Sequence, residues 1–174
     1  PVITPLGNIT IASNISHNTP GDTLAVSPQR QNEDVELVIF DRATGSLSNV
    51  IPIAGTANTD FATEAIYDTE WSNDGSKLYI SRHGDTALDA GNIYQYDIAN
   101  NALLPILPTN IFRSYGLQMA PDSSIYHLYQ QTNGGDFLLG SISFSDSLVT
   151  NPSFTYESGL FNNANMRSKQ FSSF

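Results

Sequence analysis

The chain has 174 residues, of which 40% are hydrophobic and 14% charged, so it can form a packed domain and is not expected to be disordered. Seventeen acidic and seven basic residues give a net charge of −10, which argues against a nucleic-acid partner. No apolar run approaches the roughly 18 residues that a membrane-spanning helix needs. Cysteine is absent, which excludes disulfides, thiolate metal sites and cysteine nucleophiles.

Short apolar, β-branched and aromatic runs, separated by turn residues such as Gly, Asn, Asp and Pro, occur along the whole chain, whereas helical periodicity does not. This pattern predicts an all-β protein. The expected strands cover residues 24–27, 35–41, 47–53, 67–72, 77–81, 92–98, 102–107, 115–119, 125–129 and 137–144.

The strand pattern repeats along the chain. Residues 21–27 (GDTLAVS) match residues 75–81 (GSKLYIS), and residues 121–126 (PDSSIY) give a third copy. Leu24, Leu78 and Ile125 occupy the same place in these copies, at intervals of 54 and 47 residues (78 − 24 and 125 − 78). Asp41 and Asp97 each end a strand before a turn and are predicted to cap that turn. Intervals of roughly 40–50 residues with four short strands per unit are typical of β-propeller blades.

We therefore predict three four-stranded antiparallel blades in a single propeller segment, at about residues 9–60, 61–110 and 111–174. Because propellers have about 4–8 blades, this segment is expected to belong to a larger propeller, completed by the same gene product or by another chain. Leu78 and Ile80 should share one face of their strand and Tyr79 the other, since side chains alternate along a strand. Uncovered blade faces predict that the isolated chain is not a stable monomer.

Four segments also carry a resemblance to a known family: residues 35–49 (VELVIFDRATGSLSN), 71–81 (WSNDGSKLYIS), 92–98 (NIYQYDI) and 115–122 (YGLQMAPD). In this order they resemble the surface β-propellers of Bacteroidetes, with WD40-like or YVTN-like repeats, over roughly residues 21–174 and in the C-terminal half of such a propeller. The resemblance implies an extracellular or cell-surface protein associated with gliding motility and type IX secretion. It also implies an adhesive or ligand-binding role, and it supplies no catalytic motif.

The loops between the second and third strands of propeller blades emerge on one face, around the mouth of the central channel. Here these loops, at about residues 28–34, 82–91 and 130–136, carry amides, carboxylates and Arg, which suit hydroxyl-rich ligands such as glycans. The candidate ligand-binding residues are Arg30, Asn32, Arg82, His83, Asp85, Asp89, Gln131 and Asn133. An ordinary solvated loop face is the alternative interpretation.

Three further positions have a functional and a structural interpretation. Asp85 and Asp89 are candidate ligands for Ca²⁺, although the EF-hand spacing is absent, and no other cofactor is expected. His83 could act as a general base if a carboxylate oriented it, or be an inert surface residue. His127, at the position of Ile80, is expected to be buried, neutral and held by backbone groups.

The sequence contains no Gly-x-Ser-x-Gly, no phosphate-binding loop and no His-Glu-x-x-His motif. It therefore favours a non-enzymatic surface or secreted module for adhesion or ligand binding, and it assigns no catalytic residue. Two alternatives stay open. One is a propeller hydrolase or lactonase with a metal at the channel mouth, and the other is a structural scaffold domain of a large surface protein.

Overall fold

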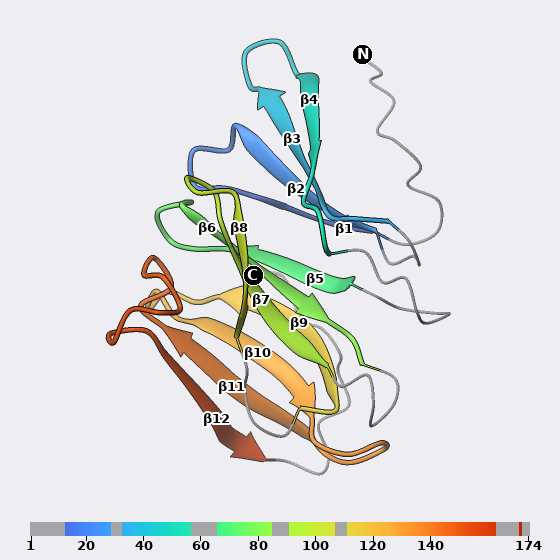
Figure 1. The fold of residues 1–174 in the computed structure, drawn as a ribbon, viewed down its shortest axis with the longest axis vertical. Helices are drawn as coiled ribbons and strands as arrows, with labels where there is room; N and C mark the ends of the chain where they lie inside the picture. The colour runs from blue at the N-terminus through green and yellow to red at the C-terminus, as the bar shows by residue number, and fades with distance from the viewer. Residues whose placement is uncertain are drawn as a thin grey trace.

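A computed structural model describes residues 13–28, 33–56, 66–84, 91–106, 111–162 and 171. Throughout these ranges the regular structure consists of twelve β-strands without a helix, which confirms the predicted all-β class. The strands form three four-stranded antiparallel sheets (Figure 1). Each sheet is a meander, in which every strand pairs with the strand next to it in sequence.

The strand bounds are as follows. The first sheet contains β1 (Ser13–His17), β2 (Thr23–Pro28), β3 (Glu36–Asp41) and β4 (Ser46–Pro52). The second contains β5 (Ile66–Trp71), β6 (Lys77–Arg82), β7 (Asn92–Asp97) and β8 (Ala102–Ile106). The third contains β9 (Arg113–Met119), β10 (Ile125–Gln130), β11 (Phe137–Ser143) and β12 (Thr155–Asn162).

The predicted repeat is visible in the register of the sheets. Leu24, Leu78 and Ile125 lie in β2, β6 and β10, the second strand of each sheet. All ten expected strands are present within a few residues of their expected bounds. Two strands were not predicted from the sequence: β1, whose segment SNISH has one large apolar residue, and β12, which is largely exposed at the outer edge of the third sheet.

The three sheets are stacked in chain order, with the second sheet in the middle (Figure 1). Strand β5 contacts β1 and β2 on one side and β9 on the other. One apolar cluster fills the space between the first two sheets: Ala25, Val35, Leu37, Ile53, Ile66, Trp71, Leu78, Ile80 and Tyr96. Another lies between the second and third sheets: Tyr79, Ile93, Ile106, Leu117, Ile125 and Ile142. The prediction that Leu78 and Ile80 share one face of their strand and Tyr79 lies on the other is therefore confirmed.

Both aspartates predicted to cap turns do so. Asp41 Oδ1 accepts a 2.8 Å hydrogen bond from the Ala43 amide, and the Thr44 hydroxyl donates to its Oδ2 at 2.8 Å. Asp97 lies at the corresponding place before the turn from β7 to β8, where it accepts hydrogen bonds from the Ala99 backbone amide and the Asn100 side-chain amide. These contacts hold each turn and give the two carboxylates a structural role.

His127 is fully buried, as expected, but its hydrogen-bond partners differ from the prediction. Its Nε2 lies 2.7 Å from the Ser114 hydroxyl and its Nδ1 lies 3.0 Å from the Tyr156 hydroxyl. Burial lowers the pKa of His127 to about 3, so the ring is neutral near pH 7. Side-chain hydroxyls from β9 and β12 thus satisfy the imidazole, in place of the backbone groups that were expected.

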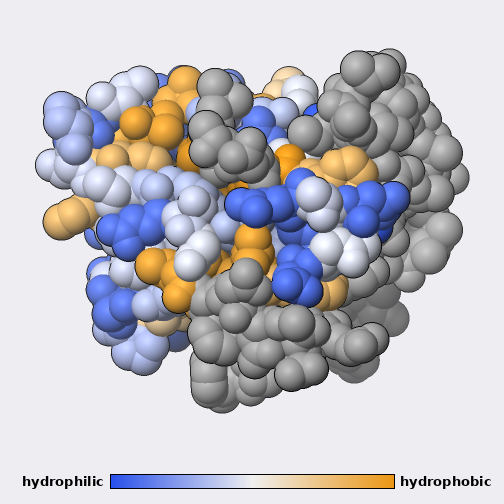
Figure 2. Space-filling model, turned by 90° about the horizontal axis from the view of Figure 1, so that it is seen from below, coloured by the Kyte–Doolittle hydropathy of each residue, from blue (hydrophilic) through white to orange (hydrophobic). Residues whose placement is uncertain are grey.

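Large apolar side chains also lie on the outside of the molecule. Viewed from below, hydrophobic residues appear as patches among hydrophilic ones (Figure 2). Among the described residues, the exposed large apolar ones are Ile15, Val50, Ile51, Phe144 and Leu160. All five belong to the two outer sheets or to the loop after β11, as expected if the middle sheet is covered on both sides.

Candidate functional site

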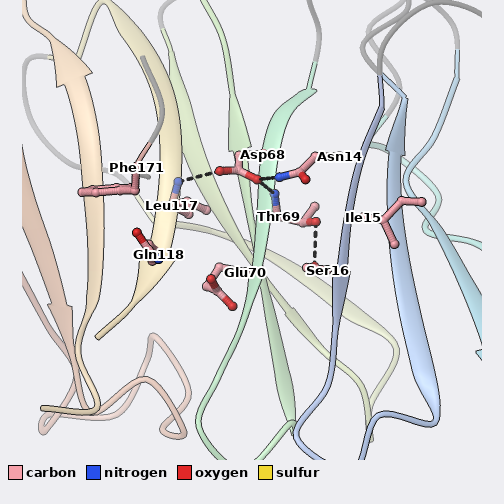
Figure 3. Close-up of a pocket in the computed structure, with 9 residues that line it drawn as sticks. All are labelled: Asn14, Ile15, Ser16, Asp68, Thr69, Glu70, Leu117, Gln118 and Phe171. Atoms are coloured by element: carbon pink, nitrogen blue, oxygen red, sulfur yellow. Dashed lines mark hydrogen bonds between the residues drawn. The ribbon is translucent and has the colours of Figure 1, made fainter. Parts of the chain in front are cut away.

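The first strands of the three sheets, β1, β5 and β9, line a polar cleft of about 250 Å³. Its walls come from all three sheets and from the C-terminal segment (Figure 3). The lining residues are Asn14, Ile15, Ser16, Asp68, Thr69, Glu70, Leu117, Gln118 and Phe171. Two carboxylates, two hydroxyls and two amides therefore meet at one place in the fold.

The local structure of β5 directs its two acidic side chains toward the third sheet. The register between β5 and β6 shifts between Ile66 and Asp68, which marks a β-bulge at Tyr67. Beyond the bulge, side chains alternate between the two faces of the sheet. Trp71 packs toward the first sheet, whereas Asp68 and Glu70 reach the backbone of β9.

Asp68 joins the three sheets through its carboxylate. Oδ1 accepts hydrogen bonds from the Asn14 side-chain amide and, at 2.8 Å, from the Thr69 backbone amide. Oδ2 accepts a 2.9 Å hydrogen bond from the Leu117 backbone amide. Asp68 is only 5% exposed, and burial, together with the nearby negative charge of Glu70, raises its pKa to about 6.

Glu70, two residues after Asp68 in β5, likewise accepts hydrogen bonds from one backbone amide of β5 and one of β9. Its Oε1 accepts a 2.9 Å hydrogen bond from the Trp71 amide, and its Oε2 accepts a 3.1 Å hydrogen bond from the Met119 amide. Burial raises the pKa of Glu70, while the hydrogen bonds from the Met119 and Trp71 amides act in the opposite direction. Both carboxylates thus serve first as acceptors for backbone amides at the edges of β5 and β9.

The rest of the cleft offers groups with spare hydrogen-bonding capacity. The Ser16 and Thr69 hydroxyls lie 3.0 Å apart and share a hydrogen bond. The carbonyl oxygen of Gln118 is buried and accepts no hydrogen bond from the described part of the chain. Glu70 lies between the ribbons of β5 and β9, whereas Gln118 lies against the ribbon of β9 on the side of Phe171 (Figure 3). A ligand rich in hydroxyl or N–H donors would match these acceptors.

The described residues of the predicted ligand loops lie in two different environments. Arg82 is half-buried at the end of β6, and His83 is only 7% exposed. The His83 ring lies 6.1 Å from that of Tyr67 and 5.2 Å from that of Tyr115, centroid to centroid. His83 is therefore part of an aromatic cluster between the second and third sheets and is not the surface residue that was expected.

Gln131 and Asn133, by contrast, are exposed in the turn between β10 and β11. Gln131 contributes to a second cavity, of about 330 Å³, whose lining comes entirely from this hairpin: Gln131, Thr132, Gly135, Asp136 and Leu138. Arg30, Asn32, Asp85 and Asp89 lie outside the described residues, and so does the predicted Ca²⁺ site. Within the described ranges, no three His, Asp or Glu side chains are grouped closely enough to hold a metal ion.

Asp68, Glu70 and Asn14 were not predicted from the sequence to form a site. A signal was present, because Asp68 and Glu70 alternate with aromatic and β-branched residues in the segment IYDTEW. Acidic residues are depleted in strand interiors, so two at alternate positions indicate a special role. Comparison with family models, curated proteins and solved structures found no match to the chain.

Proposed function

We propose that this chain is a segment of a β-propeller and serves as a non-enzymatic module for adhesion or ligand binding, at a cell surface or in secreted material. The observation that carries the proposal is that β1, β5 and β9 lie side by side and line one polar cleft. In a propeller, the innermost strands of successive blades surround the central channel in this way. Further blades would come from the same gene product or from another chain.

The proposed ligand is hydroxyl-rich, with glycans as the first class to test. The cleft combines carboxylate, hydroxyl and amide groups with the ring of Phe171, which is the combination that saccharides need for hydrogen bonding and stacking. The secreted or surface location rests on the acidic, Ser- and Asn-rich composition and on the family resemblance. No helix long and apolar enough to cross a membrane occurs in the described ranges.

Glycan-array binding by the intact chain tests the ligand class. Gln118→Ala removes the unpartnered acceptor in the cleft and should weaken binding at least tenfold. Gln131→Ala on the β10–β11 hairpin is the matched control, and it should leave binding unchanged. The reverse result would move the ligand site to the hairpin. Absence of binding to any glycan by the intact chain would refute the proposed ligand class.

The size of the isolated chain in solution tests the propeller assembly. Uncovered faces on the first and third sheets should make it self-associate, so light scattering should report a mass above 18.9 kDa. A monodisperse monomer of 18.9 kDa that unfolds cooperatively would contradict the need for further blades.

A hydrolase is the second candidate, and one observation favours it. Asp68 is a buried carboxylate beside a cavity with its pKa raised to about 6, a property shared by many general acids. Turnover of ester or lactone probes that is lost in Asp68→Asn, with the fold intact, would replace the binding module by an enzyme. We favour the binding module because both oxygens of Asp68 are already engaged by amides.

A further inference from the structure

The first strand of each sheet has an outer edge whose backbone amides need acceptors. In an antiparallel pair, every second amide points away from the partner strand. Four such amides in the second and third sheets are bound by only two carboxylates, those of Asp68 and Glu70. These four amides belong to Thr69, Trp71, Leu117 and Met119.

The pairing register shows that each carboxylate binds two equivalent amides. Thr69 and Leu117 pair with Ile80 and His127, which occupy the same place in β6 and β10, and both donate to Asp68. In the same way, Trp71 and Met119 pair with Leu78 and Ile125, and both donate to Glu70. One acid thus caps an amide of its own strand and the corresponding amide of the following sheet.

In the first sheet the corresponding amides are those of Ile15 and His17, which pair with Val26 and Leu24. The Asn18 amide donates to the Thr23 carbonyl at 3.0 Å, which sets the alternation along β1. Counting back from Asn18, the amides of His17 and Ile15 point away from β2. Among the described residues, neither amide has a hydrogen-bond acceptor comparable to Asp68 or Glu70.

Burial at the equivalent positions shows that, among the described residues, no sheet covers this side of the first sheet as one covers the other two. Thr69 is 2% exposed and Leu117 is 4% exposed, because another sheet covers each of them. Ile15 occupies the same place in the first sheet and is 53% exposed. The side chains of β1 that correspond to Asp68 and Glu70 are Asn14 and Ser16. They form hydrogen bonds with the side chains of Asp68 and Thr69 in the second sheet and do not cap the backbone amides of β1.

We propose that the outer side of the first sheet receives another four-stranded antiparallel sheet, whose first strand carries two carboxylates at alternate positions that cap the Ile15 and His17 amides. This inference rests on the proposed propeller assembly and adds the chemistry of the contact. The interface between the second and third sheets, with the sequence Asp68-Thr69-Glu70 in β5, is the template for it.

The experiment adds such a sheet to the full chain. A second copy of residues 66–106, which carries Asp68 and Glu70, is fused ahead of Pro1 through a flexible linker, and amide hydrogen exchange is measured residue by residue. Exchange at Ile15 and His17 should slow at least tenfold relative to the unfused chain. In the matched control, the added copy carries Asp68→Ala and Glu70→Ala, and exchange at both amides should stay as fast as in the unfused chain.

The other outcomes separate this inference from the assembly on which it rests. Equal protection in both fusion proteins would mean that a sheet docks without carboxylates, which overturns the inference but keeps the propeller. Protection in neither would overturn both. If the fusion proteins misfold, the unfused chain provides a second test. In the double variant Asp68→Ala and Glu70→Ala, amide exchange at Leu117 and Met119 should become at least tenfold faster. Continued protection of the Ile80 amide would show that the fold is intact. Unchanged exchange at Leu117 and Met119 would overturn the capping rule.

Discussion

Leu78 and Tyr79 are neighbours in β6, and their side chains pack against different sheets. Leu78 belongs to the cluster shared with the first sheet, and Tyr79 to the cluster shared with the third. The Tyr79 hydroxyl also donates a 2.7 Å hydrogen bond to the carbonyl of Ser145, in the loop after β11. Strand β6 is therefore buried on both faces and links the two inter-sheet cores.

Truncation of Leu78 should destabilise the stack strongly, because its side chain is fully buried between two sheets. Leu78→Ala should lower the free energy of unfolding by about 2–5 kcal/mol, measured by urea denaturation at low protein concentration. Leu160→Ala removes the same atoms at a position that is 47% exposed and serves as the control. Similar losses in the two variants would show that Leu78 is not in an inter-sheet core.

Gly91 should tolerate no side chain, because the start of β9 passes directly beside it. A Cβ at this position would lie 2.6 Å from the Ser114 nitrogen and 2.9 Å from the Arg113 carbonyl carbon. The Gly91 amide also donates a 2.8 Å hydrogen bond to the Phe112 carbonyl, so the two segments cannot separate freely. Gly91→Ala should lower the free energy of unfolding by about 1–3 kcal/mol. A thermal midpoint at or above that of the parent would contradict the close approach.

Asp68 should make the stability of the chain fall as the pH rises through 6. Its pKa is raised from 3.8 to about 6 in the folded state, so its contribution is fully present below pH 3.8 and is lost as the group ionises. Relative to Asp68→Asn, the parent should lose about 2 kcal/mol of unfolding free energy between pH 4.5 and pH 7.5. Glu70, which lines the same cleft, is present in both proteins. A difference that does not change with pH would show that Asp68 has an ordinary pKa.

His127 should remain neutral throughout the physiological range. Its ring is fully buried, and burial lowers its pKa to about 3 because it disfavours the charged form. In NMR spectra of the folded protein, its ring proton shifts should stay constant between pH 5 and pH 8. In urea-unfolded protein the same signals should titrate with a midpoint near the ordinary value of about 6.5. Titration near 6.5 in the folded protein would place the ring in contact with solvent.

The repeat could be predicted from the sequence because it is carried by residues with strong local preferences. Leu24, Leu78 and Ile125 follow turn residues at a constant offset, and the strands after them alternate clearly. Strand β1 could not be predicted in the same way. Its side chains Asn14 and Ser16 face a polar cleft, so the apolar alternation that indicates a half-buried strand is missing.

The candidate cleft was harder to predict than the fold, for a physical reason. The partners of Asp68 and Glu70 are mostly backbone amides, which every residue except proline has and which leave no mark in the sequence. Leu117 donates to Asp68 across 49 positions, and only the stacking of two sheets brings them together. His83 was placed on a loop surface for the same reason, since its burial depends on Tyr67 and Tyr115 from neighbouring strands.

Each sheet consists of one uninterrupted stretch of chain, with its four strands in sequence order. All pairing within a sheet can therefore be completed before the next stretch leaves the ribosome, because no strand waits for a distant partner. A duplication or deletion of one stretch in the gene would likewise add or remove an entire sheet without rethreading the others. The number of repeats can thus change during evolution by single recombination events, while the contacts within each sheet stay the same.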